Sequence, residues 1–169
     1  MERRKVVTSR GMPVTLQGRD IPVGDMAPNF TAIDKNMQPV KLDSLKGGIV
    51  IISVVPSLDT SVCELQTKRF NEEAAKLKAK LVTISMDLPF AQRRFCDSYK
   101  IENIIMLSDY KDREFGMRYG MYVEETGLLA RGVFIVDAGG RLAYKQIVKE
   151  IGDQPDYDAV LSEAKNLGA

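Results

Sequence analysis

The most continuous apolar stretch of this chain lies between Ile49 and Val55 and is interrupted only by a serine. A strand that is buried on both faces of a sheet has this pattern. Pro56 follows directly and ends the predicted strand, because proline has no N–H group to donate to a neighbouring strand. A polar turn occupies residues 57–60. We therefore expect a central strand whose C-terminal end lies at Pro56.

An amphipathic pattern follows the turn and predicts a helix over about residues 61–79. Apolar positions recur there at spacings of four and three, which places them on one face of a helix. These positions hold Cys63, Thr67, Phe70, Ala74 and Leu77. Asp59, Thr60 and Ser61 are all good helix N-caps. Cys63 is therefore expected in the first turn of a helix, just beyond the end of the central strand.

The remaining pattern predicts further strands and helices in alternation. Two β-prone runs around Ser9, Arg10 and Gly11 indicate an N-terminal hairpin over about residues 4–17. Strands are expected at residues 30–33, 40–42, 80–86, 103–107, 128–136 and 141–148. Helices are expected from Pro89 onward, at 111–119 and at 156–167. This order predicts one α/β domain over residues 1–169, with a mixed sheet flanked by helices.

Charge and hydropathy narrow the range of partners. The net charge of +1 implies no broad basic face, so nucleic acid is not an expected partner. No apolar run reaches membrane-spanning length, so no membrane partner is expected. The basic start MERRKVVTSR is not followed by the apolar segment that a signal peptide has. We expect a cytoplasmic protein.

The reactive side chains are few. The chain has no histidine, which excludes a Ser-His-Asp triad, a Cys-His pair and histidine-containing metal sites. Its two cysteines, Cys63 and Cys96, lie 33 positions apart and make a poor zinc site, so we expect no metal and no cofactor. A structural disulfide is not expected in a cytosolic protein. The two thiols are therefore either inert or a pair that cycles between reduced and oxidised forms.

A helix N-terminus favours a thiolate over a thiol, because its free N–H groups and partial positive charge stabilise an anion. Cys63 is thus a candidate nucleophile, although its place on an apolar stripe is equally typical of a buried core cysteine. Cys96, beside Phe95, could likewise be a small core residue. Arg131 by itself is typical of a surface arginine on a strand.

The residues Pro56-x-x-x-Thr60-x-x-Cys63 resemble the peroxidatic signature of the peroxiredoxins. The wider stretch VVPSLDTSVCELQTKRFNEEA is similar to the thiol peroxidase subfamily. So are VTSRGMPVTLQG, VGDMAPNF, MDLPFAQRRFC and LLARGVFIVD, in the order expected. One residue departs from the subfamily pattern, because Ser61 stands where proline is usual.

The resemblance implies a thioredoxin-like fold with an added N-terminal hairpin. It implies a peroxidase that reduces hydrogen peroxide and organic hydroperoxides, with Cys63 as the peroxidatic cysteine that becomes a sulfenic acid. Cys96 would be the resolving cysteine, in an intrachain Cys63–Cys96 disulfide. Thr60, Arg131 and Pro56 would complete the site, thioredoxin would be the reductant, and the protein would be a homodimer.

The side chains expected around the sulfur have distinct tasks. Thr60 lies one turn before Cys63, so its hydroxyl can approach the sulfur, and Pro56 would shield the sulfur from water. Leu58 and Phe95 are expected to line the entrance. Two alternatives remain open from the sequence: a thiol–disulfide oxidoreductase without peroxidase activity, and a redox sensor that uses the same cysteine pair.

Overall fold

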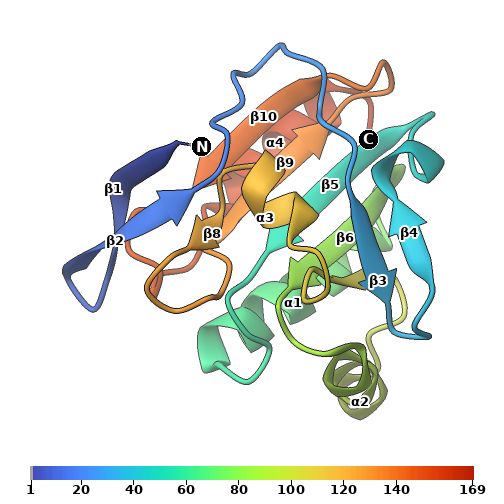
Figure 1. Cartoon of the computed structure of the whole chain (residues 1–169). Helices are drawn as coiled ribbons and strands as arrows, with labels where there is room; N and C mark the ends of the chain where they lie inside the picture. The colour runs from blue at the N-terminus through green and yellow to red at the C-terminus, as the bar shows by residue number, and fades with distance from the viewer. Residues whose placement is uncertain (1) are drawn as a thin grey trace.

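The computed structural model describes residues 2–169, so the first residue of the predicted 1–169 domain lies outside the described residues. Its largest element is a seven-stranded mixed sheet (Figure 1). The strands lie in the order β10 (Leu142–Ile147), β9 (Gly132–Val136), β5 (Ile49–Val54), β6 (Ala79–Ser85), β7 (Ile105–Ser108), β3 (Thr31–Asp34) and β4 (Pro39–Lys41). β5, β6 and β7 are parallel, whereas β9 runs antiparallel to β5. The predicted mixed sheet is confirmed.

The strand β5 is the central strand that the apolar run predicts. All of its residues are buried. Successive side chains of a strand point to opposite faces of the sheet. Ile51 accordingly belongs to one hydrophobic core cluster and Ile52 to the other. Each face of β5 therefore has its own core, which is why the strand is apolar without alternation.

Helices cover the face of the sheet to which Ile51 points. They are α1 (Ser61–Ala74), α2 (Pro89–Tyr99) and α4 (Tyr157–Asn166). Each helix contributes side chains to this core cluster, among them Phe70 from α1, Phe95 from α2 and Val160 from α4. The opposite face is covered by α3 (Glu114–Arg118), which stands in front of the sheet in Figure 1, and by the N-terminal segment. None of the helices within residues 2–169 has the length and apolar character needed to cross a membrane.

The N-terminal hairpin forms a small sheet of its own. β1 (Arg3–Ser9) pairs with β2 (Met12–Gln17), and β2 pairs with the two-residue strand β8 (Tyr122–Val123). At the turn, Arg10 and Gly11 have φ values of 50° and 76°. Two successive positive φ values match the twist of a tight hairpin. The predicted hairpin is confirmed, whereas β8 was not predicted.

Several predicted boundaries differ from the structure. The helix expected to reach residue 79 ends at Ala74, because residues 75–78 form a turn that leads into β6. The strand expected from residue 128 begins only at Gly132, since Leu129 pairs with Tyr122 instead. The helix expected over 111–119 is the shorter α3. A 3-10 turn, η1 (Leu42–Ser44), follows β4 where the prediction continued a strand.

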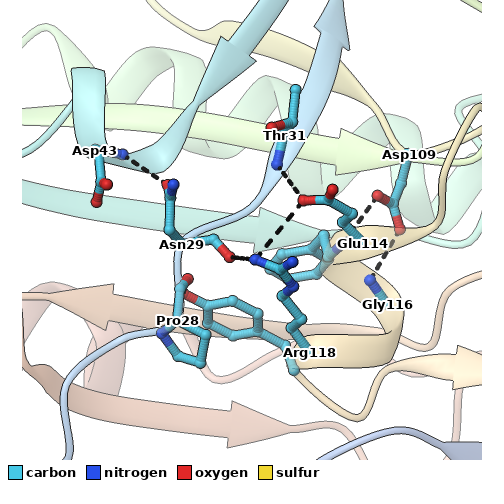
Figure 2. A network of polar contacts seen from close by, with 10 residues as sticks. Pro28, Asn29, Thr31, Asp43, Asp109, Glu114, Gly116 and Arg118 are labelled. Carbon is cyan, nitrogen blue, oxygen red and sulfur yellow. Dashed lines mark hydrogen bonds and ion pairs between the residues drawn. The ribbon is translucent and has the colours of Figure 1, made fainter.

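A polar network fixes α3 to the segment that leads into β3 (Figure 2). The Asp109 carboxylate accepts the N–H groups of Phe115 and Gly116, at 3.0 and 2.8 Å. Glu114 Oε2 accepts the N–H of Thr31 at 2.8 Å. Burial raises the pKa of Asp109 to about 6, although the two N–H groups counteract the rise. Asp109 is only 1% exposed, so a strong burial effect is expected.

The raised pKa of Asp109 makes stability pH-dependent. Below its ordinary pKa of 3.8 the Asp109 carboxyl is protonated in both the folded and the unfolded protein. Between about pH 4 and pH 6 the unfolded protein loses this proton while the folded protein keeps it. The free energy of unfolding therefore falls as pH rises over this range. The loss is at most about 3 kcal/mol. We expect the unfolding free energy of wild type, minus that of Asp109→Asn, to fall over this range. Urea unfolding at a series of pH values measures it, and a difference independent of pH would contradict the prediction.

Candidate active site

Cys63 lies in the first turn of α1, directly beyond the C-terminal end of β5. Of the three possible N-caps, Thr60 is the one used: its Oγ1 accepts the N–H of Cys63 at 3.2 Å. The same hydroxyl donates to the carbonyl oxygen of Ser57 at 3.2 Å. Ser61 begins the helix without the proline usual in the subfamily. The sulfur therefore lies at the positive end of the α1 dipole.

Arg131 contacts the sulfur directly. Its Nη2 lies 3.2 Å from Cys63 Sγ. Cys63 is 0% exposed and Arg131 only 2% exposed. The arginine lies between β8 and β9, one residue before Gly132, so it is neither at the surface nor within a strand. The structure thus brings together two residues that are 68 positions apart in the sequence.

Two further contacts orient the guanidinium group. Nε donates to the carbonyl oxygen of Ile151 at 2.7 Å, and Nη1 donates to Gln66 Oε1 at 2.9 Å. Gln66 in turn donates to Ser53 Oγ at 2.8 Å. Gln66 was not identified from the sequence, although its spacing of three from Cys63 places both on one helix face.

Arg131 has an unusual electrostatic environment. Within residues 2–169, no carboxylate lies within ion-pairing distance of it. A buried guanidinium stays charged and needs compensation. The Cys63 sulfur, 3.2 Å from Nη2, is the side-chain atom that faces this positive charge.

Tyr157 lies on the α4 side of the site and packs edge-on against Phe70, with ring centroids 5.3 Å apart. Burial raises the pKa of Tyr157 to about 12; Arg131 and Arg69 lower it, and Cys63 raises it further. The phenol is therefore neutral at physiological pH and adds no charge beside the sulfur.

Gly132 allows β10 to approach Arg131 closely. A Cβ atom at Gly132 would lie 2.5 Å from the carbonyl oxygen of Gln146 on β10, and 3.1 Å from Met121 Cε. The first distance is well below any normal contact to a backbone atom. The absence of a side chain at this position therefore sets the spacing of β9 and β10 next to the arginine.

A pocket of about 170 Å³ opens beside the site. Its walls come from the hairpin tip, the loop and first turn of α1, and the segment after β10. They include Ser9, Arg10, Pro56, Thr60, Val62, Arg131, Glu150, Ile151 and Gly152. Pro56 thus lies in the wall of the pocket. The expectation that Leu58 and Phe95 line the entrance is wrong, because both are buried in the core beneath the sheet.

Cys96 lies in the last turn of α2 and is 3% exposed. Both cysteines are free thiols and belong to the same core cluster. Burial raises the pKa of Cys96; nearby Lys35 partly counteracts this effect, and Asp97 adds to it. In this conformation Cys96 is a protonated, poorly nucleophilic thiol.

One carboxylate connects the two segments that carry the cysteines. Asp87, just before α2, accepts from Ser57 Oγ at 3.0 Å and from the N–H of Leu58 at 2.8 Å. It also accepts from Ser85 Oγ at 2.7 Å. The loop before α1 and the turn before α2 are therefore fixed to each other. The sequence contains no local signal for this contact, which joins residues about thirty positions apart.

Comparison with known proteins identifies the family. The Redoxin family profile matches residues 22–161. A thiol peroxidase of Staphylococcus aureus (strain MRSA252) is 48% identical over 161 residues, which cover 95% of this chain and 98% of that protein. The chain belongs to the redoxin family, among the thiol peroxidases.

Two further matches agree with this assignment. The thiol peroxidase of Bacillus subtilis (strain 168) is 46% identical to this redoxin over 162 residues, covering 95% of this chain and 97% of that protein. The crystal structure of a peroxiredoxin-like protein from Aquifex aeolicus superposes with a TM-score of 0.91 at 42% identity, covering 99% of each chain. The redoxin described here is a thiol-dependent peroxidase, and the predicted thioredoxin-like fold is confirmed.

Proposed function

We propose that this redoxin reduces hydrogen peroxide and organic hydroperoxides in a cycle that uses both of its cysteines. Cys63 is the peroxidatic cysteine and becomes a sulfenic acid. Cys96 resolves it as an intrachain disulfide, and thioredoxin reopens that disulfide. The observation that carries the proposal is the 3.2 Å contact between Arg131 Nη2 and Cys63 Sγ at a helix N-terminus.

In the first step the Cys63 thiolate attacks the terminal oxygen of the hydroperoxide. An S–O bond forms, the O–O bond breaks, and the leaving oxygen takes a proton to become an alcohol or water. Arg131 stabilises the negative charge that develops on the leaving oxygen. A hydroxyl group has two acceptor lone pairs. Thr60 uses one for the Cys63 N–H, so the other can accept the peroxide O–H.

Pro56 supports the reaction by forming part of the pocket wall. It is buried and lies beside Thr60 and Arg131 in the lining. An apolar ring there excludes water from the sulfur, and low local polarity strengthens the attraction between the guanidinium and the developing charge. The residue therefore supports the reaction without exchanging a proton.

In the second step Cys96 attacks the sulfenic sulfur, the disulfide forms and water leaves. Both thiols are buried in helices, and a disulfide requires Cα atoms within about 7 Å of each other. We expect the first turn of α1, the last turn of α2, or both to open locally before the bond forms. Release of Asp87 from the Ser57 loop would accompany opening at α1.

The disulfide then returns to two thiols by exchange with an external dithiol. Thioredoxin as this reductant and a homodimer as the working assembly are the parts of the proposal that rest on the family resemblance. The names of the relatives, which include thiol peroxidases, support the coarser statement that the reductant is a thiol.

The test is to map the products of a single turnover. Reduced wild type and Cys96→Ser are mixed with one equivalent of cumene hydroperoxide, quenched by alkylation and digested for mass spectrometry. We expect a 63–96 disulfide in wild type and a sulfenic acid at Cys63 in Cys96→Ser. Recovery of both thiols in free form, with the peroxide intact, would refute the proposal.

The same samples test the local opening. Amide hydrogen exchange is compared for reduced and disulfide-bonded wild type. We expect faster exchange in the oxidised protein around Cys63, Cys96 or both, because the helix turns that carry them no longer close. Identical protection of both segments in the two states would show that the disulfide forms without opening.

A further inference from the structure

Glu150 lines the same pocket as Arg131, but the hydrogen bonds of the Arg131 guanidinium go to Ile151, Gln66 and Cys63. Glu150 follows β10, and its carboxylate receives hydrogen bonds from the tip of the N-terminal hairpin. Oε1 accepts the N–H of Arg10 at 2.9 Å, and Oε2 accepts the N–H of Gly11 at 3.1 Å. Oε2 also accepts from the Thr8 hydroxyl at 2.5 Å. The hydroxyl of Thr8 and the N–H of Gly11 lower the pKa of Glu150, so the carboxylate is ionised at neutral pH.

Backbone hydrogen bonds join the same two segments. The N–H of Thr8 donates to the carbonyl oxygen of Lys149 at 2.7 Å, and the N–H of Ile151 donates to the carbonyl oxygen of Thr8 at 2.8 Å. Thr8 and Glu150 form an isolated parallel bridge. The hairpin tip and residues 149–151 therefore hold each other in position, and the Glu150 side chain completes this contact.

The other end of this segment holds Arg131. The carbonyl oxygen of Ile151 accepts from Arg131 Nε at 2.7 Å, and the N–H of Val148 donates to the carbonyl oxygen of Arg131 at 2.9 Å. A guanidinium group is planar and rigid. The position of Ile151 therefore sets the direction in which Nη2 points, and Nη2 is the atom that lies 3.2 Å from Cys63 Sγ.

We propose that Glu150 is a positioning residue for peroxide reduction. By holding the hairpin tip against residues 149–151, it fixes the Ile151 carbonyl and thereby the orientation of Arg131 toward the sulfur. This inference rests on the proposed roles of Cys63 and Arg131. It gives the N-terminal hairpin a part in catalysis, exerted from the outer rim of the pocket that Arg10 and Glu150 line.

The chain supplies a matched control in Glu125. Its two carboxylate oxygens accept the N–H of Thr15 on β2, at 2.9 and 2.8 Å. Glu125 thus binds the same hairpin through the same type of contact, but outside the walls of the pocket beside Cys63. The N–H of Thr15 is also the main reason that the pKa of Glu125 is lowered. Both glutamates can be changed to glutamine with the same loss of charge.

The experiment measures the second-order rate constant for oxidation of Cys63 by hydrogen peroxide in Glu150→Gln, Glu125→Gln and wild type. We expect about a 5- to 10-fold decrease in Glu150→Gln, because small displacements of a catalytic group are costly. No decrease is expected in Glu125→Gln. The later rate of disulfide formation, which does not use Arg131, should be unchanged in both variants. A defect of the fold alone would not separate the two steps in this way.

A second variant keeps the test decisive if Glu150→Gln does not fold. Thr8→Val removes one donor to Glu150 and should slow oxidation in the same direction. Where Glu150→Gln does fold, adding Thr8→Val to it should slow oxidation little further, because both changes act through one contact. If only Thr8→Val folds, a wild-type oxidation rate in that variant would overturn the inference. Equal rates in Glu150→Gln and wild type, or equal slowing in both glutamate variants, would overturn the inference. Wild type that consumes no peroxide would instead refute the proposed function.

Discussion

Replacing Cys63 with serine is expected to abolish peroxide consumption. A serine hydroxyl is not ionised at neutral pH, so Arg131 and the helix N-terminus have no anion to stabilise. Cys96 cannot substitute, because it is buried and its pKa is raised. Removal of a nucleophile costs on the order of 10⁴-fold or more. The measurement is stopped-flow consumption of hydrogen peroxide by the reduced protein.

Cys96→Ser is the matched control for this change. It removes the other thiol but leaves the contacts around Cys63 in place. We expect one equivalent of peroxide to be consumed at the wild-type rate, followed by loss of turnover with a dithiol reductant. If Cys63→Ser kept the fast phase and Cys96→Ser lost it, the assigned roles of the two cysteines would be reversed.

Replacing Arg131 with methionine is expected to lower the rate constant for peroxide by on the order of 10²-fold, the usual cost of removing one donor to a developing oxyanion. Arg131→Lys should fall between methionine and wild type. A single ammonium group is a point charge and cannot reproduce the planar array that reaches Ile151, Gln66 and Cys63 together. Rates are measured by stopped flow at several peroxide concentrations.

Arg131→Met should also destabilise the protein, because it leaves the buried Gln66 Oε1 without a donor. The expected cost is about 1–3 kcal/mol in the free energy of unfolding. Arg69→Met is a suitable control: its guanidinium lies over the Tyr157 ring, at 5.3 Å from the centroid, and pairs with Glu73. Its rate constant should match wild type. Equal rate constants for Arg131→Met and wild type would remove the arginine from the mechanism.

The parts of this site that could be predicted from the sequence are those encoded by neighbouring residues. The apolar run of β5 and the polar turn after Pro56 placed a helix start next to Cys63, and the structure has this arrangement. The turn at Arg10 and Gly11 likewise indicated the hairpin. Each of these features depends on backbone preferences of a few consecutive residues, which composition and periodicity report directly.

The parts that could not be predicted depend on residues far apart in the sequence. Gln66 was not singled out in the sequence, because its contact to Arg131 joins residues 65 positions apart. Arg131 itself was placed near the sulfur only by family resemblance, because it lies 68 positions from Cys63 in the sequence. Glu150 meets the hairpin tip across about 140 positions, and no local pattern records that contact.

Gly132 has a consequence for genetics. Alanine at this position would place a methyl group 2.5 Å from the carbonyl oxygen of Gln146, so β9 and β10 would have to separate beside Arg131. In a random-mutagenesis screen for lost peroxide resistance, this glycine would therefore be recovered alongside the reactive residues. It would score as essential although it contributes no atom to the chemistry. We therefore expect the activity to require glycine at position 132 as well as Cys63 and Arg131.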